Sequence, residues 1–173
     1  MVIIDKLGEE SSFSFEKLRK LLLEYGKPST DEYFREKLNG NLYEENIGAT
    51  RYILSSIELS ENNSREKYVN FYDRNKNQFV WTIEHILPQG ENIPLHWVDM
   101  IADGNTELAE KIRKEFVHKL GNLTLTGYNS QLSNMQLDKK QDKKDKDGHY
   151  IGFKNGLSLN ETISNIPIWN RDK

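Results

Sequence analysis

Apolar side chains recur at helical spacing through the first sixty residues, a pattern that predicts a series of amphipathic helices. The first run covers residues 11–26. Ser29 and Glu32 have the spacing of a capping box, so they predict a short second helix that continues through Leu38. A third helix is predicted over residues 42–57, where leucine, alanine and isoleucine recur.

From Tyr68 onward the chain changes to shorter runs of β-branched and aromatic residues, which are typical of strands. Two of these runs flank a polar segment over residues 73–77, which predicts a turn. The other elements that we expect are a loop over 88–94, a helix over 107–117, a strand over 120–126 and a helix over 129–146. Aromatic and aliphatic residues near the C-terminus indicate that the tail packs against the rest of the chain.

These elements predict an α+β fold. We expect a helical part over residues 1–66 that packs on a core over residues 67–173. The order within the core is a strand that carries a histidine, a loop, a strand opened by an asparagine, and a helix opened by a second asparagine. This order corresponds to a ββα arrangement.

Composition limits the chemistry. The 173 residues include no cysteine, which excludes a disulfide framework, a thiolate zinc site and a cysteine nucleophile, and which fits a reducing, cytoplasmic compartment. The eighteen aromatic residues (three Trp, eight Tyr and seven Phe) are too many for a disordered chain. No run approaches the ~20 apolar residues of a membrane span. A formal net charge of -3 argues against a chain that coats DNA tightly and indiscriminately.

An acid–histidine pair, Glu84-His85, ends the strand-like run Trp81-Thr82-Ile83 and precedes Pro88. A neutral imidazole can take a proton from water near pH 7. Neighbouring side chains on a regular strand point to opposite faces, so we expect the two groups to serve two different places.

Two asparagines complete the pattern, Asn122 at the start of the second strand and Asn129 at the start of the following helix. Carboxylate and amide oxygens are hard ligands that suit Mg²⁺ or Mn²⁺ better than zinc. A site with one carboxylate and one amide leaves most coordination positions to water and a phosphate, which suits metal-assisted hydrolysis of a phosphodiester.

The stretch Glu-His-Ile-Leu-Pro-Gln at residues 84–89, followed by Gly-Asn-Leu-Thr-Leu at 121–125 and the Asn-Ser, Ser-Asn and Lys positions to 139, resembles the HNH (ββα-metal) nuclease motif. More closely, it is similar to the C-terminal HNH domain of GmrSD-like bacterial restriction endonucleases. The resemblance covers residues 68–170, and more weakly the helical part before them.

The resemblance implies a role for each matching residue. His85 matches the general base, and Glu84 matches an acidic metal ligand that is Asp in many HNH nucleases. Asn122 matches the middle Asn, which ties the loop to the backbone near the catalytic histidine. Asn129 matches the residue that completes the metal site. The catalytic set implied is therefore His85, Asn122 and Asn129, and the metal ligands are Glu84 and Asn129.

Several residues keep two interpretations. Asn134 competes with Asn129 as the metal ligand, and Asn129 could instead cap a helix. His118 is a candidate for phosphate contact or leaving-group support. Lys139 falls where the family often has a basic residue near phosphate. The lysines and aspartates over residues 138–147 alternate, which is typical of a solvated helix end with paired charges.

The resulting hypothesis is an Mg²⁺- or Mn²⁺-dependent DNA endonuclease without structural zinc. The resemblance implies a larger restriction or phage-defence protein, with an N-terminal nucleotide-hydrolysing, DNA-sensing domain or subunit and with DNA, including modified phage DNA, as the partner. The chain has no Gly-rich phosphate loop of its own. The alternative hypotheses are an inactive ββα module that binds DNA or a partner protein, and a freestanding nuclease toxin, for which the sequence shows no secretion signal.

Overall fold

The computed structural model describes residues 14–26, 30–61, 69–127 and 132–170. The chain divides into two compact units, Met1–Lys37 and Leu38–Lys173. The first unit contains α2 (Phe15–Gly26) and most of α3 (Asp31–Asn39), in agreement with the first two predicted helices. None of the helices in the described ranges has the length and apolar character of a membrane span.

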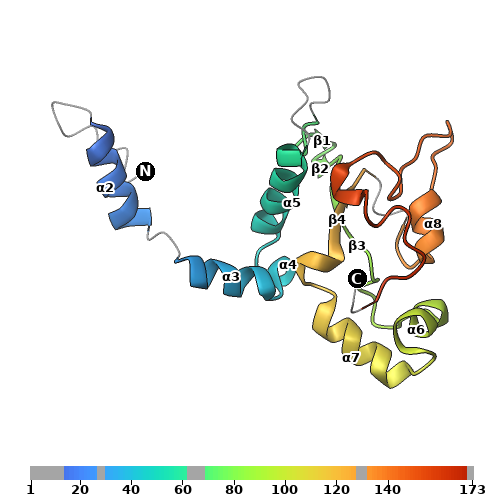
Figure 1. The fold of residues 1–173 in the computed structure, drawn as a ribbon. Coiled ribbons are helices and arrows are strands. Elements are labelled where there is room, and N and C mark those ends of the chain that lie inside the picture. The colour runs from blue at the N-terminus through green and yellow to red at the C-terminus, as the bar shows by residue number, and fades with distance from the viewer. Residues whose placement is uncertain (1–13, 27–29, 62–68, 128–131, 171–173) are drawn as a thin grey trace. The chain divides into compact units, whose positions relative to one another are not determined.

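The second unit is mostly helical and carries two small antiparallel sheets (Figure 1). Its elements in chain order are α4 (Leu42–Glu45), α5 (Ile47–Glu61), β1 (Arg74–Asn75), β2 (Gln78–Phe79), β3 (Thr82–His85), α6 (Leu95–Ala102), α7 (Thr106–Phe116), η1 (Leu120–Asn122), β4 (Leu123–Thr126), α8 (Leu137–Asp142) and η3 (Ser158–Asn160). The α+β class is therefore confirmed, while the ββα-metal core stays a prediction. The predicted division between residues 66 and 67 also stays a prediction. Helices α4 and α5 belong to the same compact unit as the strands.

The turn expected at residues 73–77 is confirmed as a hairpin between β1 and β2. Arg74 pairs with Phe79 and Asn75 with Gln78. The two residues between the strands, Lys76 and Asn77, have φ values of 49° and 66°. Positive φ at both central positions is what a tight two-residue hairpin requires, because its twist then matches that of the strands.

The central sheet pairs β3 with β4 in antiparallel register, with Ile83 opposite Leu125 and His85 opposite Leu123. Two strands alone are marginal in water, so their stability depends on what covers them. One face carries Ile83, Leu123 and Leu125, which pack with Leu54 of α5 and with Phe71. Helix α5 and Phe71 therefore cover this face of the sheet.

Two buried polar side chains fasten α5 to the rest of the unit. Arg51 donates from Nη1 to the carbonyl oxygens of Trp81 at 2.6 Å and Phe71 at 3.3 Å. Glu58 accepts from the backbone N–H groups of Ser158 at 3.1 Å and Leu159 at 2.7 Å. The first contact ties α5 to the segment before β3, and the second ties it to the C-terminal tail, which confirms that the tail packs.

A second core lies around the loop that follows β3. It contains Trp97, which is completely buried and donates from Nε1 to the carbonyl oxygen of Met135 at 2.9 Å. The other buried members of this core are Ile86, Leu87, Leu132, Leu137, Phe153 and Ile163. It joins α6, α8 and the tail on the side of the β3–β4 sheet away from α5 (Figure 1).

One expectation from the sequence needs correction, and one helix was not expected. The helix predicted from Asn129 to Lys146 is much shorter, because α8 covers only Leu137–Asp142 and residues 132–136 form turns and coil. Ser133 has a φ of 37°, which a helix does not allow, and Asp145 accepts hydrogen bonds from the N–H groups of residues 147 and 149, which closes a loop instead. Helix α6 was not predicted from the sequence.

Gly152 should be essential for the seating of α8. A Cβ atom added there would lie 1.9 Å from the carbonyl oxygen of Lys140 and 3.1 Å from that of Gln141. Both contacts are with backbone, which cannot turn away. We expect Gly152→Ala to lower the free energy of unfolding by about 2 kcal/mol or more, as overpacking does.

Urea unfolding measures this change, and Gly121→Ala is its matched control. A Cβ at Gly121 meets nothing within 4 Å, so that variant should lose little stability. Equal stability of both variants would mean that the chain does not approach α8 as closely as the structure has it.

Candidate active site

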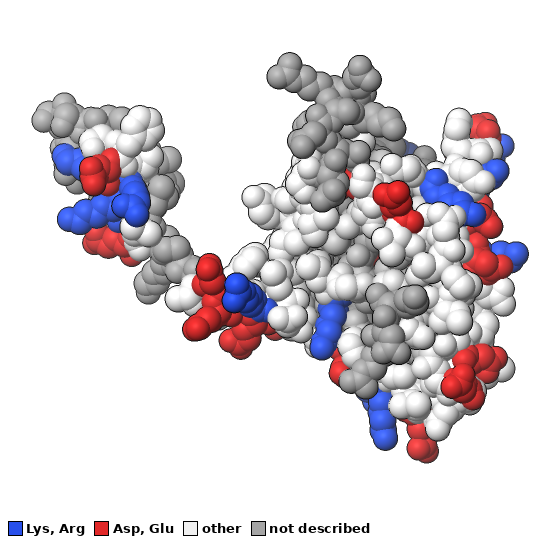
Figure 2. All heavy atoms as spheres, viewed as in Figure 1, with Lys and Arg blue, Asp and Glu red and all other residues white. Residues whose placement is uncertain are grey.

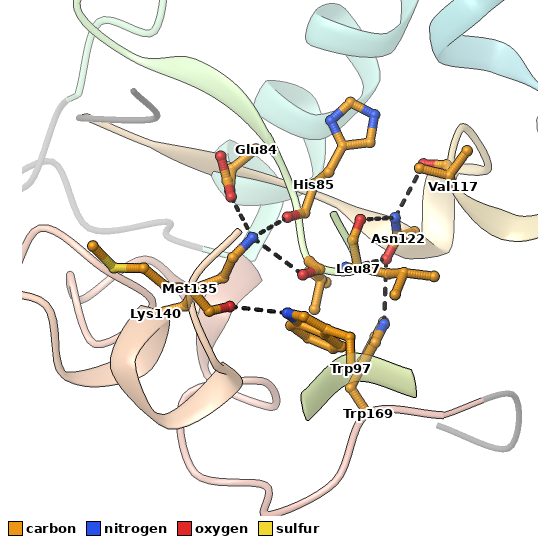
Figure 3. Close-up of polar contacts among 10 residues, drawn as sticks. Glu84, His85, Leu87, Trp97, Val117, Asn122, Met135, Lys140 and Trp169 are labelled. Atoms are coloured by element: carbon orange, nitrogen blue, oxygen red, sulfur yellow. Dashed lines mark hydrogen bonds and ion pairs between the residues drawn. The ribbon is translucent and has the colours of Figure 1, made fainter. Parts of the chain in front are cut away.

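The register of the β3–β4 pair places the side chains of Glu84 and His85 on opposite faces of the sheet, as the alternation of a strand predicts. Glu84 lies opposite Thr124 and His85 opposite Leu123. Both side chains are buried, with 3% and 5% of their surface exposed. Figure 3 shows the Glu84 carboxylate directed toward Lys140 and the His85 ring directed away from it. The adjacent acid and imidazole therefore have separate partners.

The ring of His85 is held between two other rings. Its Nε2 lies 3.4 Å from Nδ1 of His118, within hydrogen-bond reach, with the proton on one ring or the other according to the tautomer. Tyr43 of α4 meets the His85 ring edge-on at a centroid distance of 4.6 Å and stacks on His118 at 5.7 Å. The backbone N–H of Tyr43 also donates to the carbonyl oxygen of His118 at 3.3 Å. Two distant segments of the chain thus fix the imidazole of His85.

Burial, together with smaller effects of the nearby His118 and Lys140, lowers the pKa of His85 to about 4. His85 is consequently neutral at pH 7 and has a ring nitrogen able to accept a proton. An anionic phosphate beside the ring would stabilise the imidazolium form, which favours proton uptake at the moment when substrate is present.

Glu84 is paired with a lysine that is completely buried. Nζ of Lys140 donates to Oε1 of Glu84 at 2.7 Å, to the carbonyl oxygen of His85 at 2.7 Å and to that of Ile86 at 3.2 Å (Figure 3). All three N–H bonds of an ammonium group are therefore used. Lys140 was expected on a solvated helix end, and the structure corrects this: its exposed fraction is 0%.

Burial raises the pKa of Glu84 to about 7, while the Lys140 charge acts in the opposite direction. Burial likewise lowers the pKa of Lys140, and Glu84 opposes that change. Whether the proton lies on the nitrogen or the oxygen, the pair as a whole carries no net charge.

Asn122 connects the end of β3 to the start of β4. Its Oδ1 accepts from the N–H of Leu87 at 2.8 Å and from Nε1 of Trp169 at 3.2 Å. Its Nδ2 donates to the carbonyl oxygens of Leu87 at 3.1 Å and Val117 at 3.0 Å (Figure 3). These four bonds use the whole capacity of the amide. Asn122 thus holds the loop after His85, as the resemblance implies, and has no group left for a substrate.

The chemistry of Glu84 fits a hard divalent cation. Oε1 is taken by Lys140, whereas Oε2 accepts no hydrogen bond among the described residues. A carboxylate oxygen is the donor that Mg²⁺ prefers, with water and substrate phosphate in most of the remaining positions. In the described ranges, no three His, Asp or Glu side chains gather as a metal site. Glu84 could therefore contribute one oxygen to such a cation, from the face of β3 opposite the His85 ring.

The other residues predicted for the site are placed differently. Asn129 lies outside the described residues, so its role as metal ligand stays a prediction. Asn134 is exposed and its amide lies beside Gly90, in the loop that follows β3. Lys139 is exposed and lies 3.6 Å from the carboxylate of Asp138. On helix α8 it is the neighbouring lysine that reaches the buried site.

Three residues of the site were not found from the sequence: Tyr43, Lys140 and Trp169. Lys140 follows Leu137 at a spacing of three, so it shares the buried face of α8, but the surrounding charge run concealed this. Tyr43 and Trp169 reach the site only through tertiary packing, and no local pattern indicates it.

The comparison with protein-family models identifies the class of this domain as a restriction endonuclease domain. The model described as GmrSD restriction endonucleases, C-terminal domain, matches residues 27–173. The chain therefore belongs to this family. No curated protein and no solved structure matches the chain significantly.

The amide of Asn122 gives a direct test of the site's framework. In Asn122→Asp, a carboxylate would face the carbonyl oxygens of Leu87 and Val117, which lose their donors. We expect the free energy of unfolding to fall by about 2–4 kcal/mol, because buried acceptors are left without partners.

Chemical denaturation of Asn122→Asp beside Asn165→Asp measures the effect. Asn165 is exposed, so its replacement should change stability by no more than about 0.5 kcal/mol. If both variants unfolded at the wild-type urea concentration, Asn122 would not hold the loop.

Proposed function

We propose that this chain is the nuclease domain of a multidomain bacterial restriction or phage-defence protein, and that it hydrolyses phosphodiester bonds of DNA with Mg²⁺ or Mn²⁺. The observation that carries the proposal is the neutral, buried imidazole of His85 at the end of β3, next in sequence to Glu84, whose Oε2 accepts no hydrogen bond from the described residues. Membership of the restriction endonuclease family supports the reaction class.

In this proposal His85 takes the proton of the attacking water. If its Nε2–H donates to His118, then Nδ1 is the unprotonated nitrogen that receives that proton. His118 would thereby fix the tautomer of the base, which is an alternative to the direct phosphate contact expected from the sequence. Tyr43 restricts the ring to one orientation by contact on its edge.

Glu84 would hold the cation through Oε2, and Asn129 is the proposed second ligand. When bound, the cation supplies Lewis-acid stabilisation of the charge that develops on the phosphate and on the leaving oxygen. Asn122 would keep the peptide at Leu87 fixed while His85 changes protonation state, because its bonds span both strand ends.

The charge distribution of the surface supports a function in which another part of the protein delivers the DNA. On the face seen in Figure 2, the basic and acidic side chains are interspersed and most of the surface is uncharged. With a net charge of -3, the chain has little of the phosphate attraction on which non-specific DNA binding depends. The proposed partner is therefore a DNA-sensing, nucleotide-hydrolysing domain or subunit.

One observation favours the second function, a module that binds DNA or a partner protein without cutting. Lys140 occupies one oxygen of the proposed metal ligand and neutralises its charge. Calorimetric titration with Mn²⁺ separates the two functions, because an inactive module would take up no metal while it still bound DNA.

A plasmid-nicking assay tests the proposed activity. We expect cleavage with Mg²⁺ or Mn²⁺, complete loss with excess EDTA, and a rate at least about 100-fold lower in His85→Ala, the effect expected when a general base is removed. His149→Ala is the matched control, since His149 is exposed and its ring pairs with Asp145, outside the proposed site. Cleavage that survives both chelation and the loss of His85 would contradict the proposal.

A further inference from the structure

The buried ammonium group of Lys140 is surrounded by oxygen acceptors. Its side chain is completely buried, and Nζ has three acceptors within 3.2 Å: Oε1 of Glu84 and the carbonyl oxygens of His85 and Ile86. Gly152 allows the tail to close over the carbonyl oxygen of this same residue, where a Cβ would lie at 1.9 Å. The tail and α8 thus pack together to seat one ammonium group.

The three contacts restrain two different parts of the strand end. The bond to Oε1 fixes the rotamer of the Glu84 carboxylate and leaves Oε2 without a hydrogen bond among the described residues. The bonds to the two carbonyl oxygens fix the backbone on both sides of the peptide where His85 leaves β3. Lys140 therefore holds the Glu84 carboxylate and the backbone at His85 in fixed positions relative to each other.

Stability alone gives a weak reason for this arrangement. A buried ion pair often contributes no more to stability than an apolar pair of similar volume, because both charges must leave water. The pair lies where the backbone must present two chemical groups to opposite faces. Removal of a residue that hydrogen-bonds to a metal ligand and orients it typically lowers metal affinity or activity by 10–100-fold. An apolar pair could not orient a ligand in this way.

We propose that Lys140 is a positioning residue for this site: it holds Oε1 of Glu84 and the carbonyl oxygen of His85 so that Oε2 and the imidazole face the cation and the scissile phosphate together. This inference rests on the proposed nuclease function. It gives Lys140, rather than its exposed neighbour Lys139, the functional role on α8.

Lys140→Met tests the inference, because it retains most of the side-chain volume and removes the ammonium group. Leu137→Ala is the matched control: it also removes a buried side chain of α8, but one that packs in the apolar core around Trp97. Both variants are compared at a temperature at which circular dichroism shows them folded. If Lys140→Met does not fold, Lys140→Gln, which keeps N–H donors for the carbonyl oxygens, takes its place.

Two quantities are measured: the affinity for Mn²⁺ by calorimetry without DNA, and the nicking rate at saturating Mn²⁺. We expect the lysine variant to bind Mn²⁺ 10–100-fold more weakly and to cut at least about 10-fold more slowly than Leu137→Ala. Unchanged affinity would overturn the inference. Tighter binding would also overturn it, because it would make Lys140 a competitor of the cation.

The wild-type protein separates this inference from the function on which it rests. If the wild type neither binds Mn²⁺ nor nicks plasmid, the proposed nuclease function fails. If the wild type does both and the lysine variant matches the leucine control, only the role of Lys140 fails. A loss in Lys139→Met as large as that in Lys140→Met would assign the effect to the charge of α8 in general and would also overturn the inference.

Discussion

The antiparallel pairing of β3 with β4 is the constraint on which the rest of the structure depends. It is only four residues long on each side, and its register places the acid and the histidine on opposite faces. A sheet of this size does not persist in water unless both faces are covered. Helix α5 and Phe71 cover one face, while Lys140, Asn160 and the C-terminal tail supply the contacts of the other. A chain without cysteine thus stabilises its small central motif by packing and buried hydrogen bonds.

The end of β3 is held from both sides by polar groups that have every hydrogen bond satisfied. Asn122 fixes the peptide of Leu87, and Lys140 fixes the carbonyl groups of His85 and Ile86. Between these two fixed points the backbone has little freedom to move. In the proposed function, this rigidity would present the base and the metal ligand in one arrangement before any substrate arrives, which is the condition for efficient electrostatic catalysis.

The sequence predicted the parts of this arrangement that depend on local periodicity. Helical spacing indicated α2, α3, α5 and α7, and strand alternation indicated that Glu84 and His85 diverge. The prediction for the segment after β4 was wrong, because the charge pattern of residues 138–147 is typical of a long solvated helix. The positive φ of Ser133 and the loop closed by Asp145 confine α8 to six residues. Lys140, Tyr43 and Trp169 could not be identified, since their partners lie more than forty residues away in the chain.

In the proposed function, Glu84 and His85 serve one cation and one phosphate from the two faces of β3. A crystal structure with Mn²⁺ and a DNA duplex whose scissile phosphate cannot be hydrolysed tests it most directly, because the anomalous scattering of manganese locates the ion. We expect manganese bonded to Oε2 of Glu84, Lys140 still on Oε1, and the phosphate between the ion and the His85 ring. Manganese away from Glu84, or a phosphate that the His85 ring does not face, would contradict it.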